Sequence, residues 1–576
     1  MILGSKYYWK ISEVDREKML EIASAYSLSM PVCQVILSRG FQTRDAIDRY
    51  LFSSYEQDVA DITLMKDVEK AVDRIVLAID RQEKILIFGD YDVDGITSSS
   101  LMMACLVPLG AQVNFYLPHR VKDGYGLSTK IIERSADNNY KVVITVDNGT
   151  TAFEPARIAK ERGIDLIITD HHKPHGHLPD AYALVNPHQQ DCKYPFKEFA
   201  GVGVTFKVLS LLYQKKGLPL PEKAYELLLL GTVADVVPLL GENRFWVREA
   251  LHWVNGHDSL SLQTLKENGK CTAEKLSSTD IGFRIAPQIN ALGRLEDPRQ
   301  GVAFLLGVDP QETVRIGLVL LRLNEARKEI ERSIFEDVKT LITSGKIDLT
   351  KEKIIIAASS NWPPGVIGLV ASRIVSEYGR PTILLHSTPS GKVKGSCRSI
   401  NAFSIFDALQ DNTDLLDQFG GHAMAAGLAL DQDKVYLLKE RLEARAALLL
   451  TDADLQKTIH CDAQITMQDV GSKLMHDLQY LEPFGAQNPQ PYFYLKNVSL
   501  VSAPQVLKDV HIKCMVFADG IIKPLIFFNR PDLLDFFIAQ EQEQFDVVVQ
   551  VTENRWQGRS SFELLGVDVA CVKGKE

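Results

Sequence analysis

The sequence predicts a multidomain α/β protein that ends in a small β-barrel. Between about residues 66 and 240, short apolar runs alternate with helical stretches, a pattern typical of a mostly parallel sheet. A long helical stretch and a second α/β segment follow. After about residue 490, short strand-like runs separated by turn residues favour a barrel.

Length and composition limit the classes of protein. A chain of 576 residues with 45% hydrophobic and 24% charged residues is expected to form about three or four globular domains. It shows neither a signal-peptide pattern nor an uninterrupted apolar run of about eighteen residues, so we expect a cytoplasmic location and no membrane partner. The eight cysteines are scattered without a C-x-x-C pair, which argues against zinc ribbons and disulfides. A net charge of −10 argues weakly against bulk duplex DNA as a partner.

Five apolar runs are the predicted strands of the first sheet. They are continuous in Val, Ile and Leu, as in strands that are covered on both faces. Ligands of such sheets bind beyond the carboxyl ends of the strands. The runs are Ile85–Phe88, Val113–Leu117, Val142–Val146, Leu166–Thr169 and Ala183–Val185.

Acidic and histidine residues follow three of these runs. Closely spaced carboxylates repel one another, and a divalent cation relieves that repulsion, although an acidic turn is the alternative for one such loop alone. A calcium EF-hand loop is a poor match, because no Glu occupies the twelfth position counted from Asp90. The three segments are Asp90-Tyr91-Asp92-Val93-Asp94, Asp147-Asn148-Gly149 and Asp170-His171-His172.

Asp235 is a further candidate, because a lone carboxylate in a nearly uncharged stretch is costly without a partner. An oxygen-rich set with one imidazole suits Mn²⁺ or Mg²⁺ rather than tetrahedral zinc. Its carboxylates are enough for two cations about 3.5–4 Å apart, the arrangement used to activate water for phosphoryl displacement. The set is Asp92, Asp94, Asp147, His171 and Asp235.

The neighbouring residues leave alternatives open. His172 is expected either to orient the ligands or to act in catalysis, and Asp90 and Asp170 either to be outer ligands or to orient the others. Solvated loop positions are expected for His175, His177 and His188 rather than metal ligation.

The second half of the chain predicts three further elements. Residues 310–345 form one long helix with Glu and Arg pairs. The second α/β segment begins near Lys353, with a strand at Ile354–Ala357. Prolines keep residues 483–491 irregular before the barrel, where Tyr492, Phe493 and Trp556 either stack on nucleobases or fill the core.

Taken in order, four motifs resemble those of the DHH phosphoesterase superfamily: Asp92-x-Asp94-Gly95, Val146-Asp147-Asn148-Gly149, Asp170-His171-His172 and Asp235. Phe419-Gly420-Gly421-His422 is similar to the Gly-Gly-His of the companion DHHA1 domain, and Ile289–Arg294 resembles a segment of the RecJ branch. The resemblance implies a parallel-sheet DHH domain, a long connecting helix, an α/β DHHA1 domain and a C-terminal OB-fold. The expected boundaries are 1–65 for an N-terminal helical segment, 66–265 for DHH, 266–345 for the helical region, 346–452 for DHHA1 and 453–576 for the OB-fold.

That resemblance implies a 5′→3′ exonuclease of single-stranded DNA in repair and recombination. It also implies a monomer that works with a single-strand-binding protein and a helicase. The catalytic residues would be Asp92, Asp94, Asp147, His171, His172 and Asp235; all of these except His172 would bind Mn²⁺ or Mg²⁺, and Asp90 is left open as a further ligand. The substrate contacts would be Arg120, Arg294, Ser396, Arg398, Gly420, Gly421 and His422.

Three positions depart from the family pattern. Cys397 replaces a small residue, Gln288 stands where Arg is usual, and Gln487 stands where Gly is usual. The alternative functions are a DHH–DHHA1 phosphodiesterase of short oligonucleotides or cyclic dinucleotides, against which the barrel argues, and a non-catalytic DNA-binding scaffold, against which the complete ligand set argues. A family II pyrophosphatase fits less well, because Phe88 stands where its opening motif carries His.

Overall fold

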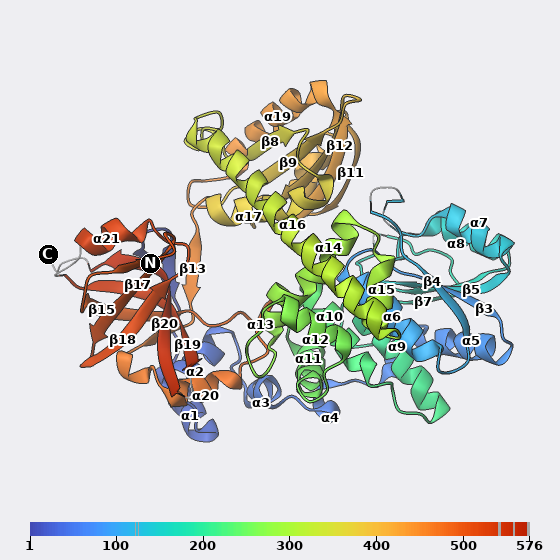
Figure 1. Ribbon diagram of the computed structural model, residues 1–576, viewed down its shortest axis with the longest axis horizontal. Helices are drawn as coiled ribbons and strands as arrows, with labels where there is room; N and C mark the ends of the chain where they lie inside the picture. The colour runs from blue at the N-terminus through green and yellow to red at the C-terminus, as the bar shows by residue number, and fades with distance from the viewer. Residues whose placement is uncertain (121–122, 125, 175, 540–542, 557–558, 573–576) are drawn as a thin grey trace. The chain divides into compact units, whose positions relative to one another are not determined.

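The computed structural model describes residues 1–120, 123–124, 126–174, 176–539, 543–556 and 559–572 (Figure 1). The chain divides into two compact units. The central unit comprises Asp48–Lys328 and Glu482–Pro489; the terminal unit comprises Met1–Ile47, Glu329–Leu481 and Gln490–Glu576.

The central unit is built on a five-stranded sheet with the order β4-β3-β5-β6-β7, in which every neighbouring pair is parallel. This confirms the predicted parallel sheet. Its strands are β3 (Lys84–Phe88), β4 (Gln112–Tyr116), β5 (Tyr140–Val146), β6 (Asp165–Thr169) and β7 (Ala183–Val185).

Both faces of this sheet are covered by helices, which explains why its strands are apolar throughout. Ile85 and Ile87 of β3 pack in one core cluster with residues of α5, α6 and α9, whereas Leu86 and Phe88 pack in a second cluster with residues of α7 and α8. Figure 1 shows α7 and α8 on one side of the sheet and α5 on the other. The bounds are α5 (Val68–Asp80), α6 (Val93–Leu106), α7 (Thr129–Asp137), α8 (Phe153–Glu161) and α9 (Gly201–Lys216).

A helical region completes the central unit. The longest helix, α16 (Pro310–Thr343), begins there and continues into the terminal unit, as predicted for residues 310–345. The others are α4 (Tyr55–Asp58), α10 (Lys223–Ala234), α11 (Gly241–Val254), α12 (Leu260–Asn268), α13 (Ser278–Asp280), α14 (Ala286–Leu295) and α15 (Arg299–Leu306).

Within the terminal unit, the second α/β segment has a five-stranded sheet with the order β11-β12-β10-β9-β8. Only β8 and β9 are parallel; the other pairs are antiparallel. The strands are β8 (Ile355–Ser359), β9 (Thr382–Ser387), β10 (Lys392–Arg398), β11 (Leu416–His422) and β12 (Ala425–Asp431), and the helices are α17 (Pro364–Tyr378), α18 (Ile405–Gln410) and α19 (Val435–Leu449).

The predicted barrel is present. Its strands pair in the order β15-β19-β20-β18-β17, and β15 also pairs with β17, so the five strands close on themselves. Closure removes the free strand edges that otherwise invite edge-to-edge pairing. The strands are β15 (Phe493–Leu500), β17 (His511–Ala518), β18 (Ile521–Phe527), β19 (Phe545–Trp556) and β20 (Arg559–Cys571), with β14 (Ala463–Ile465), β16 (Gln505–Leu507), α20 (Ser472–Gln479) and α21 (Leu533–Ala539) alongside.

The start of the chain differs from the prediction. The sequence predicts a helical segment over 1–65, but β1 (Ile2–Leu3) and β2 (Tyr8–Ile11) are strands, and β2 pairs in parallel with β13 (Thr458–Cys461). Aromatic and β-branched residues favour a strand here once a partner is available. Trp9 is fully buried, and its Nε1 donates a 2.9 Å hydrogen bond to Oδ2 of Asp568. Helices then follow: α1 (Arg16–Tyr26), α2 (Met30–Ser38) and α3 (Arg44–Phe52).

No single helix within the described ranges is long and apolar enough to cross a membrane. The bent pair of α1 and α2, with 117° between them, passes the same test by length and composition, and most residues of α2 are buried in the protein.

Candidate metal centre

The predicted site residues gather at one edge of the parallel sheet. Asp90, Asp92 and Asp94 follow β3, Asp147 follows β5, and the Asp170-His171-His172 segment follows β6. These three strands are neighbours, so their carboxyl ends bring the side chains together. Asp235 joins them from the C-terminal end of α10.

Three overlapping groups of side chains could each hold a metal ion. Within each group, the ligand atoms all lie within 4.8 Å of one another. Asp147 belongs to two of the groups, as does His171, so the three form one continuous site. Asp90, which the sequence left open, lies with the metal-ligand candidates. The groups are Asp90, Asp92 and Asp147; Asp94, His171 and Asp235; and Asp147, Asp170, His171 and His172.

Asp94 is buried and is held by the first turn of α9. Its Oδ2 accepts a 2.6 Å hydrogen bond from the backbone N–H of Gly201, and its Oδ1 accepts one of 2.7 Å from Val202. Burial and the charge of Asp92 nevertheless raise the pKa of Asp94 to about 7, against the effect of those two donors. A metal ion would relieve the repulsion that this pKa reflects.

Asp147 occupies the tightest position of the site. Its backbone is left-handed, with φ of 61°, which Asp tolerates better than most residues. A Cβ placed on Gly201 would lie 2.6 Å from the Cβ of Asp147, so only glycine fits there. Burial, followed by the charges of Asp94 and Asp92, raises the pKa of Asp147 well above its usual value.

His171 lies between three carboxylates. Its Nε2 is 3.2 Å from Oδ1 of Asp147 and 3.9 Å from Oδ2 of Asp94, while its Nδ1 is 3.7 Å from Oδ2 of Asp235. Burial and the neighbouring charge of His172 lower the pKa of His171 to about 4. The imidazole is therefore neutral at pH 7, the form that binds metal.

Asp170 orients the histidine pair. Its Oδ1 accepts hydrogen bonds from the backbone N–H of His171, at 2.7 Å, and of His172, at 3.2 Å, and lies 2.7 Å from Nδ1 of His172. Its Oδ2 accepts one of 2.8 Å from Thr150 N–H. Burial alone would raise the pKa of Asp170. The hydrogen bond with His172 and the positive charge of His172 nevertheless hold the pKa of Asp170 below its usual range. Burial alone would lower the pKa of His172, but its hydrogen bond with Asp170 and the negative charge of Asp170 raise that pKa to about 9.

The donor set fits divalent cations that prefer oxygen. Six carboxylates and two imidazoles exceed what one small ion can bind, and the predominance of oxygen suits Mn²⁺ or Mg²⁺. Asp90 Oδ1 and Asn148 Oδ1 are buried and have no hydrogen-bond partner among the described residues. Buried acceptors of this kind are costly unless a cation or donor satisfies them.

Comparisons with known proteins place the chain in a family. The model of the DHH family, N-terminal domain, matches residues 84–232, that of the DHHA1 domain matches 351–448, and that of the RecJ OB domain matches 461–568. A Bacillus subtilis protein named single-stranded-DNA-specific exonuclease RecJ is 34% identical over 572 residues, covering 99% of this chain and 71% of that protein. The chain belongs to the RecJ family.

Two further similarities agree with this membership. The Escherichia coli RecJ is 33% identical over 449 residues, covering 74% of this chain and 78% of that protein. The crystal structure of RecJ in complex with Mn²⁺ from Thermus thermophilus superimposes with a TM-score of 0.83 at 27% identity, covering 99% of this chain and 80% of the other.

Two of the arginines expected to contact substrate belong to the central unit. The guanidinium carbon of Arg120 lies 5.0 Å from the ring centroid of Tyr91. Tyr91 is the residue between Asp90 and Asp92 in the chain. Arg294 lies in the last turn of α14, and its charge and that of Arg120 both act on the Tyr91 hydroxyl. Both arginines thus lie near the segment Asp90–Asp94, which is the candidate metal-binding loop.

The other expected RecJ substrate residues belong to the terminal unit. Ser396 and Arg398 share one face of β10: Nη1 of Arg398 donates a 3.2 Å hydrogen bond to Ser396 Oγ, and its Nε donates one of 3.0 Å to Ser372 Oγ. Cys397 points to the opposite, buried face, so this departure from the RecJ pattern is a core residue. Gly420, Gly421 and His422 end β11.

The structure also shows the surroundings of the two other residues that depart from the RecJ pattern, Gln487 and Gln288. Gln487 adopts φ of 55°, the left-handed backbone for which the usual glycine is best suited. Gln288 is fully buried, and its Nε2 donates hydrogen bonds to the carbonyl oxygens of Leu265, at 2.9 Å, and Arg284, at 2.7 Å. Gln288 therefore joins two helical segments rather than facing solvent.

The aromatic residues of the barrel differ in whether their rings are exposed enough to stack on nucleobases. Phe493 is 1% exposed and belongs to the core, and Tyr492 is half-buried. The Trp556 side chain lies outside the described parts. Phe517 of β17 and Phe528, just after β18, are exposed instead. Sequence reasoning missed both, because facing can be assigned only once the register of the strands is known.

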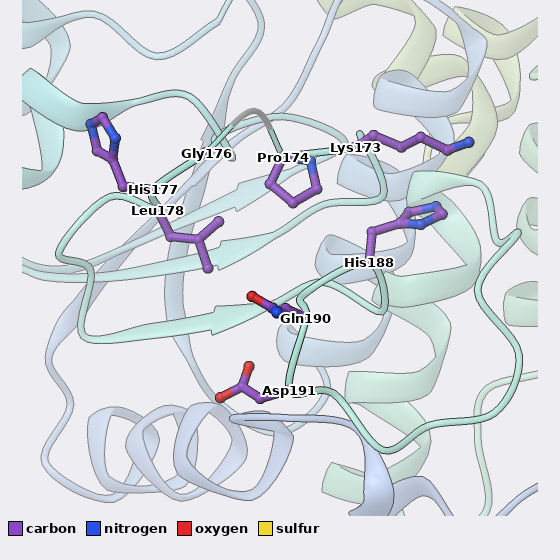
Figure 2. A pocket seen from close by; sticks show the side chains of 8 residues that line it. All are labelled: Lys173, Pro174, Gly176, His177, Leu178, His188, Gln190 and Asp191. Carbon is purple, nitrogen blue, oxygen red and sulfur yellow. The ribbon is translucent and has the colours of Figure 1, made fainter.

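The loop after His172 borders a separate cavity of about 710 Å³ (Figure 2). His177 and His188 line it, but Figure 2 shows their imidazoles on opposite sides, pointing away from each other. Within the described ranges neither belongs to a group that could hold a metal, and His175 lies outside those ranges.

Proposed function

We propose that this chain is a metal-dependent hydrolase that removes nucleotides from the 5′ end of single-stranded DNA. The observation that carries the proposal is the set of three overlapping ligand groups at the carboxyl edge of one parallel sheet, in a chain that aligns over 99% of its length with a single-stranded-DNA-specific exonuclease.

In this proposal, Asp90, Asp92 and Asp147 hold one divalent cation, and Asp94, His171 and Asp235 hold the other. Bound cations would lower the pKa of water and neutralise charge on the phosphodiester. The protein supplies the positions: α9 fixes Asp94, and Asp170 orients His171 and His172. In this proposal His172, which is more exposed than His171, contacts the scissile phosphate.

The guanidinium groups suit phosphate binding, because their planar donors match its oxygens. In this proposal Arg120 and Arg294 bind the DNA backbone near the metal-binding loop. A second set from the terminal unit binds the 5′-terminal phosphate and so determines the direction of degradation. That set is Ser396, Arg398, Gly420, Gly421 and His422.

The closed barrel favours a strand as substrate over a cyclic dinucleotide. A five-stranded OB-fold commonly binds oligonucleotides, and the exposed Phe517 and Phe528 offer ring faces on which bases can stack. The complete set of metal-ligand candidates favours an active enzyme over a DNA-binding scaffold.

We further propose the cellular setting that membership in the family suggests. The protein would act in DNA repair and recombination in the cytoplasm, as a monomer, on single strands that a helicase unwinds and a single-strand-binding protein covers. These partners belong to the proposal and are tested by co-purification from cells.

The decisive experiment compares substrates. Single-stranded DNA labelled at either end, duplex DNA, a short RNA and cyclic di-AMP are incubated with Mn²⁺ or Mg²⁺, and the released products are separated. We expect the single strand to be degraded fastest, with label lost first from its 5′ end. A faster reaction with cyclic di-AMP, or first loss of the 3′ label, would contradict the proposal.

Two variants test whether the site carries the reaction. Asp147→Ala and His171→Ala should abolish metal-dependent release of nucleotides. Matched controls are Asp180→Ala, whose exposed carboxylate pairs with Lys160, and His257→Ala, whose exposed ring stacks on Trp253. The controls should retain wild-type rates, and unchanged hydrolysis in both site variants would refute the assignment.

A further inference from the structure

Tyr91 occupies an unusual position in the chain. It lies between Asp90 and Asp92, two residues of one ligand group, yet its own side chain has no carboxylate to offer a metal. Its side chain is only partly exposed. What this side chain offers instead is the face of its ring.

The Tyr91 ring faces a cation. The guanidinium carbon of Arg120 lies 5.0 Å from the ring centroid, within the range of a cation–π interaction. Burial and the charge of Asp92 raise the pKa of Asp90, and the charge of Arg120 acts in the opposite direction. The Tyr91 ring therefore contacts the guanidinium that, in the proposed function, binds the DNA backbone.

The backbone of Tyr91 is fixed from another element. A Cβ placed on Gly293 of α14 would lie 2.1 Å from the carbonyl oxygen of Tyr91, so α14 packs directly against the metal-binding loop. Arg294 follows Gly293, and its charge also acts on Tyr91. One residue thus interacts with both arginines of the central unit that are expected to bind DNA.

We propose that Tyr91 is a positioning residue that holds the Arg120 guanidinium beside the metal-binding loop, and that it thereby sets how tightly the DNA backbone is bound. This inference rests on the proposed function, because it concerns the grip of Arg120 on a phosphate. Tyr91 itself takes no part in the chemical step. Its ring face is the group that acts, and its hydroxyl is dispensable.

The test measures KM and kcat for single-stranded DNA with saturating Mn²⁺. Tyr91→Leu removes the ring and should raise KM about 3- to 30-fold, the range expected for a cation–π contact, with kcat within about twofold. Tyr91→Phe keeps the ring and should restore the wild-type KM. Tyr140→Leu, at the opposite end of the same sheet, is the matched control and should leave KM unchanged.

A double-mutant cycle separates positioning from general damage. In an Arg120→Met background, Tyr91→Leu should raise KM by less than about twofold, because its partner is already gone. Fully additive effects would overturn the proposal. So would a loss of Mn²⁺ affinity in Tyr91→Leu, since that would mean that the ring supports only the loop.

The outcomes also distinguish this inference from the proposed function. If the wild-type protein does not degrade single-stranded DNA, the proposed function fails. If the wild type is active and Tyr91→Phe is as impaired as Tyr91→Leu, the function stands and the role of the ring is refuted.

Discussion

The backbone N–H of Gly201 donates a 2.6 Å hydrogen bond to Oδ2 of Asp94, and the missing side chain of the same glycine makes room for Asp147. One residue at the start of α9 therefore positions carboxylates from two different strand ends. Gly201 offers no ligand atom to a metal; it matters because its N–H binds Asp94 and because it has no side chain to displace Asp147.

Gly201→Ala should reduce activity about 100-fold, because a Cβ within 2.6 Å of Asp147 must displace a metal-ligand candidate. Activity and Mn²⁺ affinity are measured on the folded variant. Gly282→Ala is the matched control, since its Cβ would meet only Val233 at an ordinary 3.6 Å. Wild-type activity in Gly201→Ala would show that Asp147 can move without loss.

Asp170→Asn should lower the Mn²⁺ affinity or the activity about 10- to 100-fold, as is usual when a residue that orients a ligand is changed. The amide keeps the size of the side chain but loses the charge that holds His172. The Mn²⁺ concentration for half-maximal activity is the measurement. Asp180→Asn, on the surface, serves as control, and equal values for both variants would contradict an orienting role for Asp170.

The affinity for Mn²⁺ should rise with pH through about 7. Below that pH the carboxyl of Asp94, whose pKa is about 7, is protonated, and the proton competes with the cation. His171 does not contribute to this window, because its pKa of about 4 leaves it neutral throughout. Calorimetry at pH 6, 7 and 8 in buffers of different ionisation enthalpy measures the affinity and the protons released. An affinity that is constant over this range would refute the prediction.

Asp568→Ala should destabilise the terminal unit by about 3–5 kcal/mol, because it removes a fully buried charge to which other groups are paired. Its carboxylate accepts hydrogen bonds from Ser5 Oγ at 2.5 Å and from Trp9 Nε1 at 2.9 Å, and it lies 3.5 Å from Arg530. Urea unfolding measures the change. Asp532→Ala removes a mostly exposed partner of the same arginine and should cost less than about 1 kcal/mol. Equal losses would argue against this account.

Much of the central unit could be predicted from local patterns. Apolar runs identify strands that are covered on both faces, and the rule that ligands bind at their carboxyl ends places Asp92, Asp94, Asp147 and His171 at one edge. The closeness of Asp235, which comes from the end of α10, was expected from its uncharged surroundings and from the family resemblance.

Other features depend on distances that no local pattern contains. Asp90 could not be assigned, because its grouping with Asp147 depends on side-chain positions across two strands. The strand at Tyr8–Ile11 was missed because its partner β13 lies far along the chain. Phe493 and Cys397 face inward because of strand register, which composition does not reveal.

The bond between Trp9 and Asp568 joins residues that are 559 positions apart in the sequence. A ribosome releases the Trp9 segment long before it makes the Asp568 segment, so the nascent chain carries an apolar strand that has no partner during most of its synthesis. Contacts of such long range slow folding and expose the chain to aggregation. The first residues of this protein can therefore reach their final place only after nearly the whole chain has been translated.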